Sequence, residues 1–275
     1  MEPDDSITRL SAPAGVTVRT ATEVPGGHVF GADNGLVYFQ GRNGSAGRVA
    51  AGQFTVSADG TRLAIMGAVA VSVYTLPGLH RLGSYTFPGA TAGGPTVVAV
   101  GGNWVLLFDE DQPGGAPGVS VVWNVATNAA TWFAAAEPFT IGSDGSVLRR
   151  ILNSADRSCY GYTLLSDLRK TAGRCGESEP VAGGVDAAAL SDDNQWAAIS
   201  ISDRQPPVLV RTDDLRAGNW RPTVLSAPAG TPLYWDRNDV IIAGDRSYRC
   251  NTTGHCTRLA TPADATIVPL AGLPG

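Results

Sequence analysis

The sequence has little lysine, little histidine and no long apolar run. Lys170 is the single lysine among 20 basic residues, and charged residues make up 16% of the 275 positions. The net charge of −5 argues against a nucleic-acid-binding surface, because such a surface needs clustered positive charge. No apolar stretch approaches the roughly 18 residues of a membrane-spanning helix. The preference for Arg, together with many Ala and Gly, is typical of a GC-rich bacterial genome.

The motifs of common catalytic sites are also missing. The chain contains no Gly-x-Ser-x-Gly elbow, no Gly-x-Gly-x-x-Gly fingerprint and no P-loop lysine. The three histidines lie apart in turn-like segments, at His28, His80 and His255. Asp144, Asp192 and Asp236 are candidate channel carboxylates, but each falls on a repeated turn, where closing the turn explains an aspartate better. We therefore expect no catalytic residue and no cofactor.

What the sequence does contain is a repeated strand–turn–strand unit. Its clearest copy is residues 54–65, in which Asp59 and Gly60 close a turn between two apolar runs. Weaker copies recur at a period of about 43 residues, and the turn in each copy is marked by Ser143-Asp144-Gly145, Ser191-Asp192-Asp193 and Trp235-Asp236-Arg237. The period divides the chain into six units.

Each unit contains four short runs of β-branched and aromatic residues, which predict strands. They are clearest in the second, third and sixth units, at 54–57, 62–66, 69–76 and 80–87, at 96–100, 104–108, 119–125 and 130–133, and at 232–235, 240–243, 247–250 and 256–259. Four strands in about 43 residues are typical of a β-propeller blade. We expect an all-β propeller of six four-stranded blades, with seven blades, one incomplete, as the alternative.

The two ends of the chain resemble one another. Residues 7–14 (Ile-Thr-Arg-Leu-Ser-Ala-Pro-Ala) and 257–263 (Thr-Arg-Leu-Ala-Thr-Pro-Ala) both resemble an outer strand followed by the crossing to the next blade. We therefore expect residues 1–275 to form one propeller domain, with the ring closed by the two termini. Residues 265–270 are an alternative inner closing strand.

The repeat resembles that of a known family. Ser57-Ala-Asp-Gly-Thr-Arg-Leu-Ala-Ile65 is similar to the WD40-like repeat of TolB-type propellers, Ser-Pro-Asp-Gly-Lys-x-Ile/Leu-Ala-Phe/Tyr. The match is good in the second unit and degenerate elsewhere. The Trp-Asp dipeptide of WD40 blades occurs once, at Trp235-Asp236, on the expected innermost strand. The resemblance implies the propeller architecture and transfers no activity, because propellers include enzymes, ligand binders and scaffolds.

The four cysteines occur as two local pairs. Cys159 and Cys175, and likewise Cys250 and Cys256, face each other across the expected third and fourth strands of their units. Of the three possible connectivities, the disulfides Cys159–Cys175 and Cys250–Cys256 place equivalent bridges in two blades. The alternative is a metal site of Cys250, His255 and Cys256, although zinc sites usually have closer cysteines and four ligands.

Persistent disulfides require an oxidising compartment. Residues 1–5 are acidic and polar, unlike a signal peptide. We therefore expect an extracellular or periplasm-equivalent location, with an export signal or membrane anchor upstream in a longer parent protein.

Charged pairs recur in the turns after the second strand. These turns contain Asp156-Arg157, Asp203-Arg204 and Asp245-Arg246, with Asp109-Glu110 at the corresponding place in the third unit. Such turns share one face of a propeller with the crossings between blades, where Arg can bind carboxylates or phosphates in a forked geometry. The alternative is that these residues simply favour exposed turns. Asp109, Glu110 and Asp111 also begin a loop that is a weaker candidate for Ca²⁺, since it lacks the full calcium-binding pattern.

Three classes of function follow from these features. The first, which we favour, is a non-enzymatic exported module of a bacterial envelope that binds a protein or a small polar ligand on one propeller face. The second is a hydrolase or lyase with its site in the central channel, which requires at least two converging titratable groups. The third is a scaffold within an assembly, which requires an exposed apolar patch.

Overall fold

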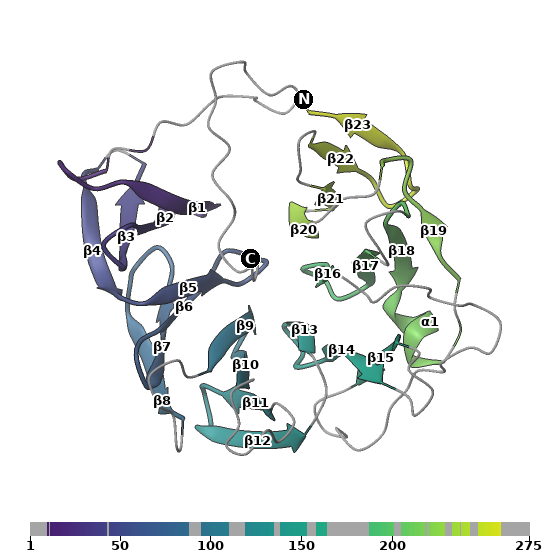
Figure 1. The fold of residues 1–275 in the computed structure, drawn as a ribbon, viewed down its shortest axis with the longest axis horizontal. Helices are drawn as coiled ribbons and strands as arrows, with labels where there is room; N and C mark the ends of the chain where they lie inside the picture. Colours follow the sequence, from purple (N-terminus) through teal and green to yellow (C-terminus); the bar gives the residue numbers. More distant parts are fainter. Residues whose placement is uncertain are drawn as a thin grey trace.

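Antiparallel β-sheets stand radially around a central axis, each with one edge near the axis and the other at the rim (Figure 1). The fold is an all-β propeller, as the repeat predicted. It is seen in a computed structural model that describes residues 10, 12–42, 44–87, 95–109, 119–134, 138–152, 158–163, 187–200, 205–217, 219, 221–228, 233–236, 238–242 and 247–259.

The described residues form the following strands and one short helix: β1 Val18–Val24, β2 Gly27–Ala32, β3 Leu36–Gly41, β4 Ala46–Ala51, β5 Gln53–Val56, β6 Arg62–Met66, β7 Ala70–Thr75, β8 Arg81–Thr86, β9 Thr96–Gly101, β10 Trp104–Asp109, β11 Val119–Asn124, β12 Ala129–Ala134, β13 Pro138–Ile141, β14 Val147–Leu152, β15 Ser158–Thr163, β16 Ala187–Leu190, β17 Trp196–Ser200, β18 Val208–Arg211, α1 Thr212–Arg216, β19 Thr223–Val224, β20 Leu233–Asp236, β21 Asp239–Ile242, β22 Tyr248–Cys250 and β23 Cys256–Arg258.

Each sheet is a meander of consecutive strands, and we number the sheets 1 to 6 in chain order. Sheets 1, 2, 3, 5 and 6 have four strands each, whereas sheet 4 has the three strands β13-β14-β15. The described residues therefore form five four-stranded blades, and the expectation of six such blades is wrong in this count. The segment expected to supply a fourth strand to sheet 4, around Cys175, lies outside the described residues. The described strands form no further sheet, which also argues against seven blades.

The second strands of sheets 2, 3, 5 and 6 are buried on both faces. Leu63, Ala64, Ile65 and Met66 of β6 are each at most 6% exposed, although successive side chains of a strand point to opposite faces. The same continuous burial occurs in β10, β17 and β21, at Val105, Leu106, Leu107, Ala197, Ala198, Ile199, Val240, Ile241 and Ile242. A continuous apolar run therefore marks a strand that lies between two neighbouring sheets.

The hydrophobic cores lie between sheets and join them in pairs. Trp123 of β11, which is fully buried, belongs to one cluster with Val71 and Val73 of β7 and packs against the ring of Tyr85. Equivalent clusters join sheets 1 and 2, 3 and 4, 4 and 5, and 5 and 6. Trp235 adds a hydrogen bond from its Nε1 to the carbonyl oxygen of Ala189, 3.0 Å away in sheet 5. Each sheet is thus held mainly by its neighbours.

The strand predictions were accurate where Asp and Gly turns separate the runs. In sheets 2, 3 and 6 every predicted boundary lies within one residue of the observed one. In the fifth unit the apolar run at 208–212 predicts a strand, and β18 ends one residue earlier because Thr212 begins α1. Most of the outer strand expected at the start of residues 7–14 lies outside the described residues. Leu10 and Ala12 pack against Phe30 and Tyr38 of sheet 1.

Among the described residues, no helix is both long enough and apolar enough to span a membrane.

Candidate functional site

The turns between the first and second strands lie together on one side of the ring, which we call the turn face. Gly60 in the β5–β6 turn lies against Pro25 in the β1–β2 turn, and Gly102 in the β9–β10 turn lies against Ser143 in the β13–β14 turn. The opposite side, which bears the crossings between sheets, is the crossing face. Neighbouring turns on the turn face therefore contact one another around the axis.

A serine and an aspartate shape the β5–β6 turn. The hydroxyl of Ser57 and the backbone N–H of Thr61 donate to Oδ1 of Asp59 over 2.6 and 2.9 Å, and Gly60 has a φ of 68°. Partial burial acts to raise the pKa of Asp59. The hydrogen bonds from Ser57 and Thr61 and the positive charge of Arg62 outweigh burial and hold this pKa below its ordinary value. Asp59 is thus a structural turn residue.

The same geometry recurs in sheet 5, one residue later than the repeat predicted. Ser191 Oγ and the N–H of Gln195 donate to Oδ1 of Asp193 over 2.7 and 3.0 Å. Asn194 takes the place of the glycine, with a φ of 55°. Asp193, rather than Asp192, is therefore the residue equivalent to Asp59.

The turn of sheet 4 is closed in a related way. Asp144 accepts a 2.9 Å bond from the N–H of Ser146 through Oδ1, and Gly145 has a φ of 83°. Asp144 was a candidate channel carboxylate in the sequence. Its side chain instead closes its own turn, as the turn interpretation predicted.

Sheets 3, 4 and 5 approach one another closely at the turn face because glycines lie at the contacts. A Cβ atom on Gly101 would lie 2.5 Å from the carbonyl oxygen of Gly142, and a Cβ on Gly142 would overlap the side chain of Asn194. With glycine at position 142, Asn194 Nδ2 reaches Ser143 Oγ, to which it donates over 3.0 Å. The side chain of Asn194 therefore joins the turns of sheets 4 and 5.

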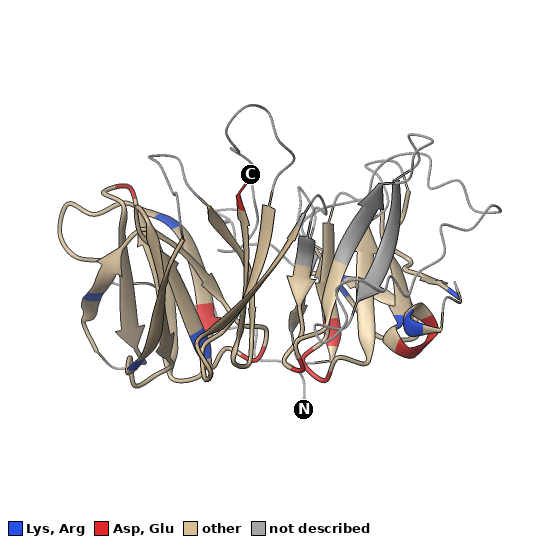
Figure 2. Ribbon diagram, turned by 90° about the horizontal axis from the view of Figure 1, so that it is seen from below, with Lys and Arg blue, Asp and Glu red and all other residues tan. Residues whose placement is uncertain are grey.

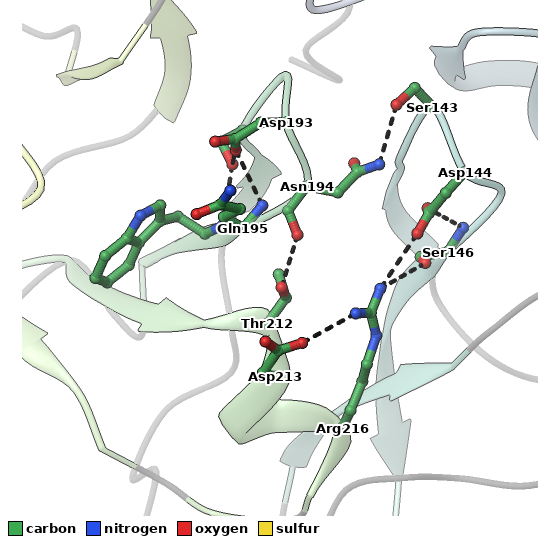
Figure 3. A network of polar contacts seen from close by, with 11 residues as sticks. Ser143, Asp144, Ser146, Asp193, Asn194, Gln195, Thr212, Asp213 and Arg216 are labelled. Atoms are coloured by element: carbon green, nitrogen blue, oxygen red, sulfur yellow. Dashed lines mark hydrogen bonds and ion pairs between the residues drawn. The ribbon is translucent and has the colours of Figure 1, made fainter.

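A short helix extends this connection. α1 follows β18 directly, and its first residue, Thr212, donates through Oγ1 to the carbonyl oxygen of Asn194 over 2.6 Å. From the last turn of α1, Arg216 contacts Asp213 over 3.1 Å and Asp144 of sheet 4 over 3.2 Å (Figure 3). Arg216 Nη2 also lies 3.3 Å from Ser146 Oγ. One guanidinium thus connects the helix of sheet 5 to the turn of sheet 4.

These elements line a polar pocket on the turn face. Its volume is about 370 Å³, and its lining consists of Asp144, Asp193, Asn194, Gln195, Arg211, Thr212, Asp213 and Arg216. The guanidinium of Arg211 lies over the ring of Trp196, 5.1 Å from its centroid. The size falls within the roughly 300–1,000 Å³ of common ligand sites, so we take this pocket, which the sequence did not predict, as the candidate site.

The surroundings of the pocket are acidic. Figure 2 shows acidic residues at several turns along the edge of the ring on which the helix lies. Among the described residues, the exposed acids of this face, all in or beside turns, are Glu23, Asp59, Asp144, Asp193 and Asp213. Because the whole chain also has a net charge of −5, the turn face attracts cations more than anions.

Of the residues that the sequence proposed for binding, only Asp109 is among the described residues. Asp109 ends β10 and is buried, with 8% of its surface exposed. The others lie outside the described residues, at Glu110, Asp111, Asp156, Arg157, Asp203, Arg204, Asp245 and Arg246. The pocket is lined by residues outside this set.

One predicted disulfide is present. Cys250 and Cys256 are bonded to each other and join β22 to β23, as the sequence predicted. This bond excludes the alternative metal site, because a sulfur in a disulfide is not a thiolate ligand. Among the described residues no group of three or more His, Cys, Asp or Glu side chains is placed to hold a metal ion. The Cys159–Cys175 pair lies outside the description, since Cys175 is not among the described residues.

No protein-family model matches the sequence, and no curated protein matches it. Solved structures resemble the fold. A chain of the mitotic checkpoint complex has a TM-score of 0.54 and 12% identity, over 93% of this chain and 88% of that one. The structure of U3-55K has a TM-score of 0.51 and 13% identity, over 92% of this chain and 83% of that one. A chain of the complex of KlAtg21 with the coiled-coil of AgAtg16 has a TM-score of 0.57 and 11% identity, over 86% of this chain and 81% of that one. At such low identity the likeness shows the fold alone.

Proposed function

We propose that this chain is a non-enzymatic binding module that holds a protein partner on the turn face of its propeller. The observation that carries the proposal is the polar pocket between sheets 4 and 5, whose charged groups are held in place before any ligand arrives. Asp193 is oriented by two turn hydrogen bonds, and Arg216 by two carboxylates. A preorganised polar site costs less ordering entropy on binding than a flexible one.

The carboxylates of this face favour recognition over catalysis. Asp59, Asp144 and Asp193 each accept a hydrogen bond from the backbone of their own turn. In Asp59 these bonds and the charge of Arg62 outweigh partial burial and hold the pKa below its ordinary value. A carboxylate that is bound by its own turn suits a fixed surface better than a group that must exchange protons. The structural neighbours include chains of named protein complexes, which supports a protein as the partner.

The finer features of the proposal come from the sequence. Export to an extracellular or periplasm-equivalent space is supported by the Cys250–Cys256 disulfide, and a bacterial envelope by the composition. We also propose that residues 1–275 form a single ring. The Asp-Arg turns of the crossing face, with Asp109–Asp111, are a second proposed surface, for a small polar ligand.

The test compares the two faces. The wild-type chain is cross-linked in an envelope fraction, and the same experiment uses the charge reversals Asp213→Arg on the turn face, Arg204→Glu on the crossing face and Arg48→Glu on the rim strand β4, the last as the control. We expect one protein to be captured by the wild type, Arg204→Glu and Arg48→Glu, and to be lost with Asp213→Arg. Loss with Arg204→Glu alone would move the site to the crossing face. Turnover of an envelope substrate that Asp144→Asn abolishes would favour the channel hydrolase or lyase instead.

A further inference from the structure

The pocket between sheets 4 and 5 has a charge balance that selects its ligand. Its lining contains the carboxylates of Asp144, Asp193 and Asp213 and the guanidinium groups of Arg211 and Arg216. Arg216 contacts two of the carboxylates, Asp144 and Asp213. The five charged groups together leave the lining with one net negative charge, in a protein that is itself negative.

Two carboxylates remain accessible to a ligand. The side chain of Asp213 is 80% exposed although its Oδ1 contacts Arg216, and Asp193 is also exposed. Each is the chain neighbour of a residue in the 2.6 Å bond between Thr212 and Asn194, so the two acids project from directly connected segments. Figure 3 shows Asp193 and Asp213 on either side of this bond.

We propose that this pocket receives an arginine side chain from a protein partner, with the guanidinium bound by Asp193 and Asp213. This inference rests on the proposed function and names the group that the turn face recognises. A guanidinium presents five N–H donors in a planar fork that suits carboxylate oxygens. Arg216 already binds Asp213 and Asp144 within the same pocket, so the incoming group repeats an interaction that the site itself contains.

The balance of charge in the lining also favours a cation. Arg211, which lines the pocket, lies over the ring of Trp196, 5.1 Å from its centroid. An anionic ligand meets three carboxylates and two guanidinium groups in this lining, so the balance of charge opposes it. An arginine is therefore attracted where a glutamate is repelled.

The test uses the intact chain and three short peptides, acetyl-Gly-Arg-Gly-amide, its neutral citrulline counterpart and its glutamate counterpart. Backbone ¹⁵N–¹H spectra are recorded during titration at low salt. We expect the arginine peptide to shift the amide signals of Asn194, Gln195 and Thr212, and the other two peptides to leave them in place. Higher salt should weaken the binding, because exposed charges are screened.

Matched variants locate the charge. Asp193→Asn keeps an oxygen acceptor for the turn and should weaken arginine-peptide binding about two- to five-fold, the scale of one exposed ion pair. Asp213→Asn is the second variant, with the same expectation. Asp59→Asn is the control, because it removes the same charge from the equivalent turn of sheet 2, outside the pocket. Spectra without peptide show whether each variant is folded.

The outcomes separate this inference from the proposed function. Equal shifts with the arginine and citrulline peptides, or shifts with the glutamate peptide alone, would overturn the assignment of the pocket to arginine. Capture of a partner through the turn face without any arginine-peptide shift would also overturn it, while the proposed function stands. Arginine-specific shifts that Asp193→Asn reduces and Asp59→Asn does not would support it, even where no partner depends on the turn face.

Discussion

Asp59 determines the acid sensitivity of one turn. Its pKa is lowered because hydrogen bonds from Ser57 and Thr61 and the charge of Arg62 outweigh partial burial. A carboxylate with a lowered pKa in the folded state stabilises the fold at pH values above its unfolded pKa of about 3.9. This stabilisation is lost as the pH falls from about 4 through the folded pKa.

We predict that Asp59→Asn reduces the loss of stability below about pH 4. Urea unfolding at pH 7 and at several values below pH 4 measures the difference between wild type and variant. Ser57→Ala is the companion variant, because it removes the 2.6 Å donor to Asp59 and should change the acid dependence in the same direction. Identical acid dependence in all three proteins would contradict the assignment.

Gly101 allows the inner strands of sheets 3 and 4 to approach. A Cβ atom at this position would lie 2.5 Å from the carbonyl oxygen of Gly142, which belongs to the backbone and has little freedom to move. We predict that Gly101→Ala lowers the free energy of unfolding by about 1–3 kcal/mol, the usual cost of overpacking. Gly44→Ala is the control, because its Cβ would lie 3.9 Å from its nearest neighbour. Chemical denaturation measures both, and equal stabilities would refute the steric argument.

At the scale of elements, the β22–β23 hairpin is joined to itself and to sheet 5. The Cys250–Cys256 disulfide closes a loop with a sequence separation of six residues. Ser226, which follows β19, accepts a hydrogen bond from the N–H of Cys256 through Oγ and donates its own N–H to Gly254. The disulfide therefore stabilises a loop on which the neighbouring sheet depends.

Removing this disulfide should destabilise the fold. We predict that Cys250→Ala combined with Cys256→Ser lowers the free energy of unfolding by about 2 kcal/mol, the loop-entropy value for so short a loop. Thermal and urea unfolding under non-reducing conditions measure the change. Cys256→Ser alone should give nearly the same loss, since either substitution breaks the bond. A double variant as stable as wild type would show that the hairpin needs no covalent link.

There is a physical reason why the sequence predicted some elements and missed others. Strands in sheets 2, 3 and 6 were found because Gly and Asp mark their turns and continuous apolar runs mark their doubly buried strands. The five residues of α1 were missed because so short a helix has no periodic pattern to detect. The turn residue of sheet 5 was placed at Asp192 instead of Asp193, because Asn194 replaces the glycine that marks the other turns.

The candidate site was missed for a related reason. Its parts are separated by long stretches of sequence, with Asp144 in sheet 4 and Asp193 and Arg216 in sheet 5. They meet because Gly142 leaves room for Asn194 and because α1 turns the chain back toward sheet 4. Contacts between neighbouring sheets of the propeller depend on how the sheets pack, and the repeat pattern does not predict that packing. The sequence signal that was present is the run Thr212-Asp213-Asp214, acidic residues at the start of a helix.

At the scale of the whole molecule, we expect local stability to fall from the second strand to the rim strand in every sheet. The second strands of sheets 2, 3, 5 and 6 are hydrogen-bonded on both edges and buried on both faces, whereas the rim strand β8 has exposed residues such as Leu82. We predict that amide hydrogen exchange in the native state is slowest in β6 and β10 and fastest in β8 and β12. Mass spectrometry of peptic fragments measures this order. Equal protection across the strands of one sheet would argue against it.

The cores between sheets also make the stability of one blade depend on the next. Leu107 of sheet 3 is fully buried in the cluster that includes Ala64 and Met66 of sheet 2. We predict that Leu107→Ala lowers the free energy of unfolding by about 2–5 kcal/mol and accelerates exchange in β6 as well as in β10. Leu82→Ala, at a position 42% exposed on β8, should change neither quantity appreciably. Acceleration confined to sheet 3 would mean that the sheets are independent units, whereas acceleration in both follows from a core that belongs equally to two blades.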